Sequence, residues 1–173
     1  MTERRRSPER PAPDATGRRV SKTAAPRAIL VLSGPNLQLL GTRETAIYGK
    51  ETLRAIHTRL EGIARDRGAR VDCRQSNHEG ELCDWLGHAP AEGFAGVLIN
   101  AGAYTHTSLA LYDAIRAIRL PTVEVHVSNP EAREAYRHES KLAPACLGKV
   151  AGFGTNSYVL ALRGLLDHLD AKR

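Results

Sequence analysis

The sequence predicts an α/β fold in which a parallel β-sheet carries helices on both of its faces. The chain has 173 residues, of which 42% are hydrophobic. That is enough for one domain with a sizeable core and too little for two ordinary domains. After a polar N-terminal stretch, short apolar runs alternate with longer segments of helical periodicity. This alternation is typical of βαβ units, which build parallel sheets.

The apolar runs and periodic segments place each element along the chain. Strands are expected at 28–32, 69–74, 96–100, 122–127 and 149–153. Helices are expected at 52–67, 79–88, about 107–119, about 130–137 and 157–169. In the first helix, Leu53, Ile56 and Leu60 recur at helical spacing, and Gly68 ends it. Five such strands suit a flavodoxin-like, doubly wound sheet, whose ligands bind beyond the carboxyl ends of the strands.

The net charge of +6 is concentrated in residues 1–27, which contain eight basic and three acidic side chains. The other residues hold 17 basic and 16 acidic side chains and are nearly neutral. Residues 1–27 also contain four prolines and almost no large apolar side chains, so we expect a disordered basic tail before a folded domain at 28–173. A neutral domain has no broad electrostatic footprint for nucleic acid, and none is expected as a partner.

Composition also limits the compartment and the kinds of site. No apolar run approaches the length of a membrane helix, and no apolar segment of a signal peptide follows the basic N-terminus. A cytoplasmic protein is therefore expected. The three cysteines (Cys73, Cys83, Cys146) lack CxxC spacing, which argues against a disulfide framework or a zinc site. The seven histidines show no HExxH pattern, so no metal is expected.

The segment after the first strand, residues 33–49, is a long glycine-containing loop. Its spacing is not GxGxxG and Pro35 lacks an amide hydrogen, so we reject a dinucleotide site. Arg43 and Tyr48 are close in sequence, and a cation beside a phenol favours the phenolate that would act as a base. Lowering a tyrosine pKa from about 10 to about 7 requires roughly 4 kcal/mol, so the loop would have to exclude water. A surface loop with an incidental tyrosine is the alternative interpretation.

A second polar segment follows the third expected strand. Asn100 ends that strand, where its amide would face a ligand. His106 lies among hydroxyl residues at a helix start, and Asp113 follows seven residues later on nearly the same helical face. A capping or core histidine explains His106 equally well.

The third segment begins in the fourth strand. Glu124 and His126 share one side of this strand, and a carboxylate beside an imidazole fixes its tautomer and favours its acidic form. Ser128 or Asn129 would cap a following helix, whose free amides would form an anion site. Arg133 and Arg137, four residues apart on one helix face, would bind a carboxylate or, as the usual alternative, form a solvated ion-paired face.

These segments belong to one larger pattern. Its parts are, in order, Ser33-Gly34-Pro35-Asn36-Leu37 with Gly41-Thr42-Arg43-Glu44 and Ile47-Tyr48-Gly49; Arg74-Gln75-Ser76-Asn77-His78-Glu79-Gly80; Asn100-Ala101-Gly102-Ala103-Tyr104-Thr105-His106-Thr107-Ser108; Glu124-Val125-His126-Val127-Ser128-Asn129; Ala132-Arg133-Glu134 with Arg137-His138; and Gly152-Phe153-Gly154. Over about residues 28–169, the chain thereby resembles the type II 3-dehydroquinate dehydratases. The resemblance implies a flavodoxin-like catalytic domain that converts 3-dehydroquinate to 3-dehydroshikimate and water.

The resemblance also implies a role for each matching residue. Tyr48 would remove a C2 proton and Arg43 would activate it, on a loop that acts as a lid. His126, oriented by Glu124, would protonate the departing C1 hydroxyl. Asn36 would help position a water beside the enolate oxygen. The ring hydroxyls would be held by Asn100, His106 and Arg137, and the substrate carboxylate would be bound by the backbone amides of Val127 and Ser128.

At the level of the assembly, the residue matching Asp113 reaches a neighbouring subunit's site in a dodecamer of trimers. No metal or organic cofactor is implied. The sequence departs from the family pattern at Ser33, where asparagine is usual, at Thr45, where proline is usual, and at Tyr112, where arginine is common. Pro130, Lys149 and Thr155-Asn156-Ser157 are also atypical.

Two alternatives to the biosynthetic enzyme stay open at this point. The same reaction serves quinate breakdown as well as the shikimate pathway. An inactive binding protein that kept the fold, with the basic tail contacting nucleic acid, is the other alternative.

Overall fold

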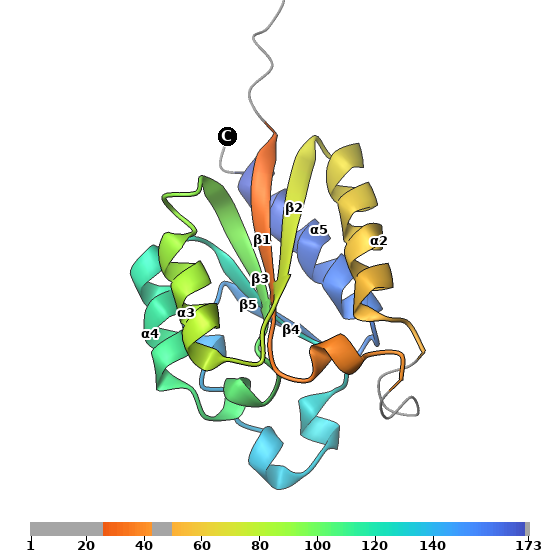
Figure 1. The fold of residues 1–173 in the computed structure, drawn as a ribbon, viewed down its shortest axis with the longest axis vertical. Coiled ribbons are helices and arrows are strands. Elements are labelled where there is room, and N and C mark those ends of the chain that lie inside the picture. Colours follow the sequence, from red (N-terminus) through yellow and green to blue (C-terminus); the bar gives the residue numbers. More distant parts are fainter. Residues whose placement is uncertain (1–25, 43–49, 172–173) are drawn as a thin grey trace, which may run out of the picture.

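The computed structural model describes residues 26–42 and 50–171, in which strands and helices alternate along the chain (Figure 1). The strands are β1 Arg27–Ser33, β2 Ala69–Gln75, β3 Phe94–Asn100, β4 Thr122–His126 and β5 Gly148–Ala151. The α-helices are α2 Leu53–Asp66, α3 Glu79–His88, α4 Leu109–Ile118 and α5 Asn156–Asp170. Short 3-10 helices are η1 Leu37–Leu39, η2 Gly102–His106, η3 Pro130–Ala132, η4 Ala135–Arg137 and η5 Ala143–Ala145.

The five strands form one parallel sheet in the order β2-β1-β3-β4-β5. This confirms the predicted flavodoxin-like winding, in which the chain reverses direction across the sheet between β1 and β3. The register aligns the ends of the central strands, because Ser33 pairs with Gln75 on one side and with Asn100 on the other. The loops that follow β1, β2 and β3 therefore leave the sheet at the same edge.

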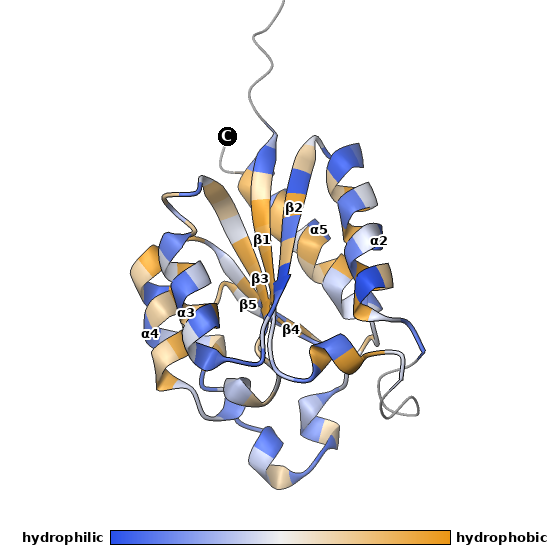
Figure 2. Ribbon diagram, in the orientation of Figure 1, coloured by the Kyte–Doolittle hydropathy of each residue, from blue (hydrophilic) through white to orange (hydrophobic). Residues whose placement is uncertain are grey.

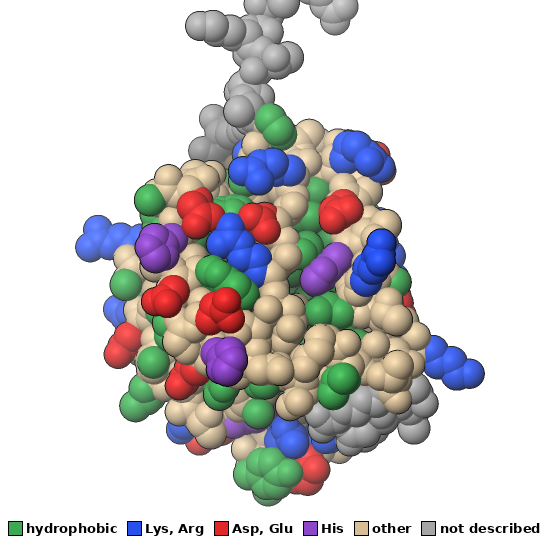
Figure 3. Space-filling view, viewed as in Figure 1, with side chains coloured by type: hydrophobic (Ala, Val, Ile, Leu, Met, Phe, Trp, Pro, Cys, Tyr) green, Lys and Arg blue, Asp and Glu red, His purple; other side chains and the backbone are tan. Residues whose placement is uncertain are grey.

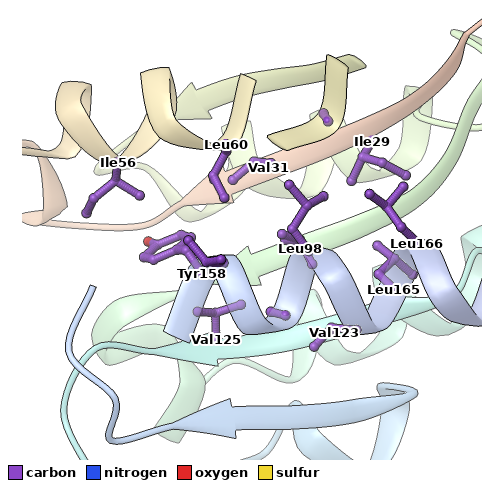
Figure 4. Packing of buried hydrophobic residues seen from close by; sticks show 14 of the residues in the cluster. Ile29, Val31, Ile56, Leu60, Leu98, Val123, Val125, Tyr158, Leu165 and Leu166 are labelled. Atoms are coloured by element: carbon purple, nitrogen blue, oxygen red, sulfur yellow. The ribbon is translucent and has the colours of Figure 1, made fainter. Parts of the chain in front are cut away.

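Helices cover both faces of the sheet, with α2 and α5 on one face and α3 and α4 on the other (Figure 1). Side chains of a strand alternate between the two faces, so each strand supplies both cores. Ile29 and Val31 of β1 pack with Leu60 and Tyr158 under α2 and α5 (Figure 4). Residues of β1 that alternate with them, such as Leu30, pack under α3 and α4. Figure 2 accordingly shows the central strands β1 and β3 as mostly hydrophobic, whereas polar residues lie along the edge strand β2 and on the helices.

Local sequence explains where the helices begin. The Thr52 side chain accepts a hydrogen bond from the Ala55 amide at 3.2 Å, so α2 begins at the residue after the predicted start. The Ser108 side chain accepts from the Leu111 amide at 2.9 Å, so α4 begins at Leu109 and not at the predicted residue 107. Before it, Gly102–His106 form the 3-10 helix η2.

The predicted helix over about 130–137 is wrong. The structure has two separate 3-10 turns there, η3 and η4, and Arg133 between them is extended, with φ −106° and ψ −163°. Asn129 caps the first turn through the Glu131 amide at 3.2 Å, but the Glu131 carboxylate binds Lys149 at 2.7 Å and does not close a capping box. Arg133 and Arg137 therefore share no helix face, and no α-helix N-terminus forms an anion site here.

The polar surface matches the near-neutral composition of the folded part. On the face shown in Figure 3, basic and acidic side chains are interspersed over the helices and strands. No helix of the described residues is both long and apolar enough to span a membrane. The predicted disordered tail lies almost entirely outside the described residues, although Arg27 already belongs to β1.

Candidate active site

A pocket lies at the carboxyl edge of the sheet, where the ends of β1, β3 and β4 meet. Its cavity of about 130 Å³ is bounded by the turn after β1, by η2 and by the segment that follows β4. The lining residues are Pro35, Asn36, Leu37, Leu39, Leu40, Asn100, Gly102, Ala103, His106, His126, Val127, Ser128, Pro130, Arg133 and Arg137. The edge predicted from the carboxyl ends of the parallel strands is therefore the edge that carries the pocket.

At the base of the pocket, a carboxylate and an imidazole form a buried pair on β4. His126 Nε2 lies 2.6 Å from Glu124 Oε1, and the two side chains share one side of the strand as predicted. Glu124 is 0% exposed and His126 is 8% exposed. With Nε2 bound to the carboxylate, Nδ1 is the ring nitrogen left for a ligand in the pocket, which His126 lines.

The Glu124 carboxylate has a second partner from outside the strand. Ser140 Oγ lies 2.9 Å from Glu124 Oε1 and 2.8 Å from Oε2. Ser140 Oγ in turn accepts hydrogen bonds from the backbone amides of Leu142 and Ala143. The buried charge is thus held by hydrogen bonds on both of its oxygens, as burial of a carboxylate requires.

Asn100 presents a donor of fixed direction to the pocket. The Gly102 amide donates to Asn100 Oδ1 at 3.2 Å, and Asn100 Nδ2 donates to the Tyr158 hydroxyl at 3.0 Å. Because a backbone N–H cannot accept, the oxygen of the side-chain amide must face Gly102. The second N–H of Nδ2 is then the group that a ligand in the pocket would meet.

The phenol that holds Asn100 is itself enclosed by the core. Burial raises the pKa of Tyr158 to about 12, although its hydrogen bonds to Ser33 and Asn100 oppose that shift. Tyr158 is therefore a neutral hydroxyl at physiological pH. Ser33 Oγ, at 3.4 Å, is its other described partner, so Ser33 occupies a supporting position behind the pocket.

His106 has a fixed tautomer in its neutral form. Its Nδ1 lies 2.8 Å from the carbonyl oxygen of Glu139, and a carbonyl only accepts, so Nδ1 carries the hydrogen. Nε2 of the neutral ring is then an acceptor. Asn100 and His106 together offer a donor and an acceptor to a ligand, which suits one or more hydroxyl groups.

Asn36 reaches the pocket through an unusual backbone conformation. Its φ of 66° and ψ of 0° are left-handed, a conformation in which asparagine is enriched among non-glycine residues. The backbone N–H of Asn36 donates to Asn77 Oδ1 at 3.0 Å, and Gln75 Nε2 donates to the same oxygen at 3.1 Å. The end of β2 thus fixes the turn that carries Asn36.

The outer wall of the pocket is cationic. Arg137 Nε binds Glu134 at 2.9 Å, and Arg133 Nε lies 3.3 Å from the same carboxylate. The guanidinium groups of Arg133 and Arg137 thus line the pocket together with Val127 and Ser128. Such a wall attracts an anionic ligand.

Of the predicted site residues that the structure describes, Asp113 is not brought to this pocket. Asp113 is exposed on α4 and does not line it. Arg43 and Tyr48 lie outside the described residues. Conversely, sequence reasoning did not identify Ser140, Tyr158 and Asn77 as supports of the site. Two of them carried a signal, because Asn77 lies within the family pattern and Tyr158 is a hydroxyl on the apolar face of a helix.

The polar side chains of the pocket suit acid–base chemistry. Among residues 26–42 and 50–171, no three histidine, cysteine, aspartate or glutamate side chains are grouped so as to hold a metal ion. What the described pocket combines is a buried imidazole–carboxylate pair, two directed polar groups and a cationic wall. This set suits proton transfer to a small, hydroxylated anion.

Comparisons with known proteins agree with this chemistry. A family model described as "Dehydroquinase class II" matches residues 27–166. A "3-dehydroquinate dehydratase" from Rhizobium johnstonii is 56% identical over 139 residues, which cover 80% of this chain and 95% of that protein. A protein of the same name from Nostoc is 54% identical over 144 residues, covering 83% of this chain and 97% of its own length.

Solved structures give the same result. A type II dehydroquinase from Butyrivibrio crossotus superposes with a TM-score of 0.80 at 39% identity, covering 82% of this chain and 99% of that chain. A type II dehydroquinase from Propionibacterium acnes gives a TM-score of 0.78 at 39% identity, over 82% of this chain and 97% of its own. With this fold, this pocket and these relatives, the chain belongs to the class II dehydroquinase family.

Proposed function

We propose that this chain is a type II 3-dehydroquinate dehydratase, a hydro-lyase of the shikimate pathway that converts 3-dehydroquinate to 3-dehydroshikimate and water. Relatives of that name are more than half identical over nearly their whole lengths. The observation that carries the proposal is the buried Glu124–His126 pair at the base of a pocket with a cationic wall. Elimination of water needs an acid for the departing hydroxyl, and this pair is built to be one.

His126 is the general acid in this proposal. The C1 hydroxyl leaves as water when His126 Nδ1 gives it a proton, and Glu124 holds the ring through Nε2 while the imidazolium is charged. Because Glu124 is fully buried and bound to Nε2, it fixes the ring in the orientation that leaves Nδ1 for the departing hydroxyl. After the reaction, the neutral ring recovers its proton from solvent.

Tyr48 is the base and Arg43 the cation that activates it, as the family pattern implies. Both lie outside the described residues, and the support for them is the position of the residues that flank them. A Cβ on Gly41 would lie 2.9 Å from the carbonyl oxygen of Lys50, so the two described ends of this segment are adjacent. Gly41 directly follows Leu39 and Leu40, which line the pocket.

The other lining residues bind the substrate. Its ring hydroxyls would accept from Asn100 Nδ2, donate to His106 Nε2 and contact Arg137. Its carboxylate would bind the amides of Val127 and Ser128 beside the cationic wall. Asn36, held in its left-handed conformation, would position a water at the oxygen where enolate charge develops.

The assembly and location belong to the same proposal. Asp113 is exposed on α4 and is therefore accessible to a neighbouring subunit. A dodecamer of trimers would bring Asp113 to a neighbouring pocket, and a size determination in solution with the Asp113→Ala variant tests this. The unpaired thiols of Cys73, Cys83 and Cys146 support the reducing cytoplasm as the location.

The decisive experiment is turnover of 3-dehydroquinate by the purified chain, followed through the ultraviolet absorbance of the conjugated enone. His126→Ala should lower kcat by about 10²- to 10⁴-fold, because the departing hydroxyl loses its acid. Tyr48→Phe should nearly abolish turnover. His88→Ala is the matched control, since His88 is an exposed histidine at the end of α3 away from the pocket. Turnover at the wild-type rate by His126→Ala would contradict the mechanism.

A further inference from the structure

The carboxylate that orients the acid depends on a residue 16 positions away in the sequence. Ser140 lies on the segment between η4 and η5, and its hydroxyl reaches both oxygens of Glu124. In the described part of the chain, the hydrogen bonds to this carboxylate come from His126 and Ser140. Oε2 has Ser140 as its partner, whereas Oε1 has both His126 and Ser140.

The direction of the Ser140 hydroxyl is fixed. A serine oxygen has one hydrogen to donate and two lone pairs that accept. The amides of Leu142 and Ala143 donate to it at 3.1 Å and 2.9 Å, and they occupy its accepting capacity. Its one hydrogen must then be directed at the carboxylate, where it is shared between the two oxygens.

This donor sets the rotation of the carboxyl group. With Ser140 in place, both oxygens are satisfied and Oε1 stays in line with His126 Nε2 at 2.6 Å. Without it, Oε2 would be a buried carboxylate oxygen with no hydrogen-bond donor among the described residues, which is unfavourable. The carboxyl group would then be free to rotate out of line with the imidazole.

The segment that carries Ser140 also contacts the other ligand-binding groups. Arg137 precedes it, the Glu139 carbonyl holds His106, and the Lys141 amide donates to the Thr105 carbonyl at 2.8 Å. Ser140 therefore ties the acid to the same short segment that places a binding histidine and an arginine. A change at this segment is transmitted to the proton donor through one hydroxyl.

We propose that Ser140 is a positioning residue for the reaction, which holds the Glu124 carboxylate in the orientation that makes His126 an effective acid. The proposal rests on the proposed function for its kinetic consequence. It differs from a purely structural role, in which Ser140 would only hold the start of η5 by accepting hydrogen bonds from the amides of Leu142 and Ala143. The two roles are separated by whether the effect of losing the hydroxyl passes through Glu124.

The test compares Ser140→Ala with two further variants in the full chain. We expect Ser140→Ala to lower kcat by about 10- to 100-fold while KM changes little, because the substrate-binding groups remain. Ser140→Thr, which keeps the hydroxyl, should restore most of kcat. Ser157→Ala is the matched control, since Ser157 is a buried serine that accepts from the Phe153 amide and does not line the pocket.

A double-mutant cycle identifies the path of the effect. In a Glu124→Gln background, Ser140→Ala should lower kcat less than about twofold, because the carboxylate on which Ser140 acts is already absent. An effect as large as in the wild-type background would mean that Ser140 acts only as a structural cap, and it would overturn the proposal. If Ser140→Ala does not fold, Ser140→Cys supplies the same test with a much weaker donor.

A spectroscopic measurement on the free protein separates this proposal from the proposed function. The His126 Nε2 proton, in a short charge-assisted hydrogen bond to Glu124, should give a downfield, slowly exchanging NMR signal that is lost in Glu124→Gln. Ser140→Ala should shift this signal upfield and speed its exchange, and Ser157→Ala should not. No turnover of 3-dehydroquinate by the wild type would overturn the proposed function, whereas an unchanged signal or unchanged kcat in Ser140→Ala would overturn the role of Ser140.

Discussion

The polar side chains of the pocket owe their direction to groups on other elements. Asn100 is set by the Gly102 amide and by the phenol of Tyr158, and His106 is set by the carbonyl of Glu139. Each partner is a pure donor, a pure acceptor or a hydroxyl with its other contact known, so the orientation follows from hydrogen-bond chemistry alone. A ligand consequently meets one donor and one acceptor that need no reorientation.

Tyr158→Phe tests this arrangement at a single atom. Removing the hydroxyl leaves an Nδ2 hydrogen of Asn100, which is 3% exposed, without its described acceptor. We expect a loss of about 1–3 kcal/mol in the free energy of unfolding, measured by urea denaturation. KM for 3-dehydroquinate should rise as well, because the free amide can rotate.

Tyr112→Phe is the control for this prediction. The Tyr112 hydroxyl contacts Arg116 on the surface of α4 and has no link to the pocket. If both variants have the same stability and KM as the wild type, Tyr158 does not position Asn100.

At the level of elements, the close approach of two loops brings the pocket walls together. The turn after β1 and the start of η2 touch so tightly that a Cβ on Gly34 would lie 2.5 Å from the carbonyl oxygen of Ala101. The Gly34 amide donates to the Asn100 carbonyl at 2.8 Å across the same contact. Glycine is required here for space, and the contact joins the segments that carry Asn36 and Asn100.

Gly34→Ala should therefore force these two loops apart. We expect a loss of about 1–3 kcal/mol in unfolding free energy, as for other overpacked contacts, together with a fall in kcat/KM. Thermal denaturation followed by circular dichroism, with the turnover assay, measures both.

Gly62→Ala is the opposite case and serves as the control. Gly62 lies inside α2, and the nearest atom to an added Cβ is 4.0 Å away on Arg65. This variant should keep its activity and gain about 0.5–1 kcal/mol in stability, because alanine favours the helix. Equal stability of Gly34→Ala and wild type would show that the loop contact is not tight in solution.

At the scale of the whole molecule, ion pairs join the beginning of the sheet to the last helix. Arg27 at the start of β1 binds Asp170 at the end of α5 at 2.6 Å, and Arg67 after α2 contacts Asp167 and Asp170. Hydrogen bonds from Arg27 and then Arg67 lower the pKa of Asp170 from its usual range. The pairs are exposed on the carboxylate side, so their contribution is screened by solvent and salt.

The lowered pKa of Asp170 predicts how stability depends on pH. A carboxyl whose pKa is lower in the folded state stabilises the fold fully above its unfolded pKa, about 3.9, and this contribution disappears as the pH falls through the folded value. Asp170→Asn should reduce the unfolding free energy at pH 7, and the difference from wild type should vanish in acid. Urea titrations at several pH values measure this, and a difference that does not shrink as the pH falls below the unfolded pKa would contradict it.

The sequence by itself determined the fold and the edge of the sheet that carries the pocket, because both depend on local patterns. Alternating apolar runs and helical periodicity placed all five strands and four α-helices, and the parallel sheet then put Asn100, Glu124 and His126 at one edge. The two-residue period of a strand was enough to pair Glu124 with His126. The segment over 130–137 was predicted wrongly, because the capping pattern there is used by a three-residue turn.

Only the tertiary structure decided which groups support the site. Ser140 reaches Glu124 from 16 residues away, Asn77 holds the Asn36 amide across 41 residues, and Tyr158 holds Asn100 across 58. No periodicity or short motif encodes such contacts, since they depend on how the loops and α5 pack against the edge of the sheet. The polar residues that line the pocket follow from the strand ends, whereas the hydrogen bonds that orient those residues exist only once the distant segments have come together.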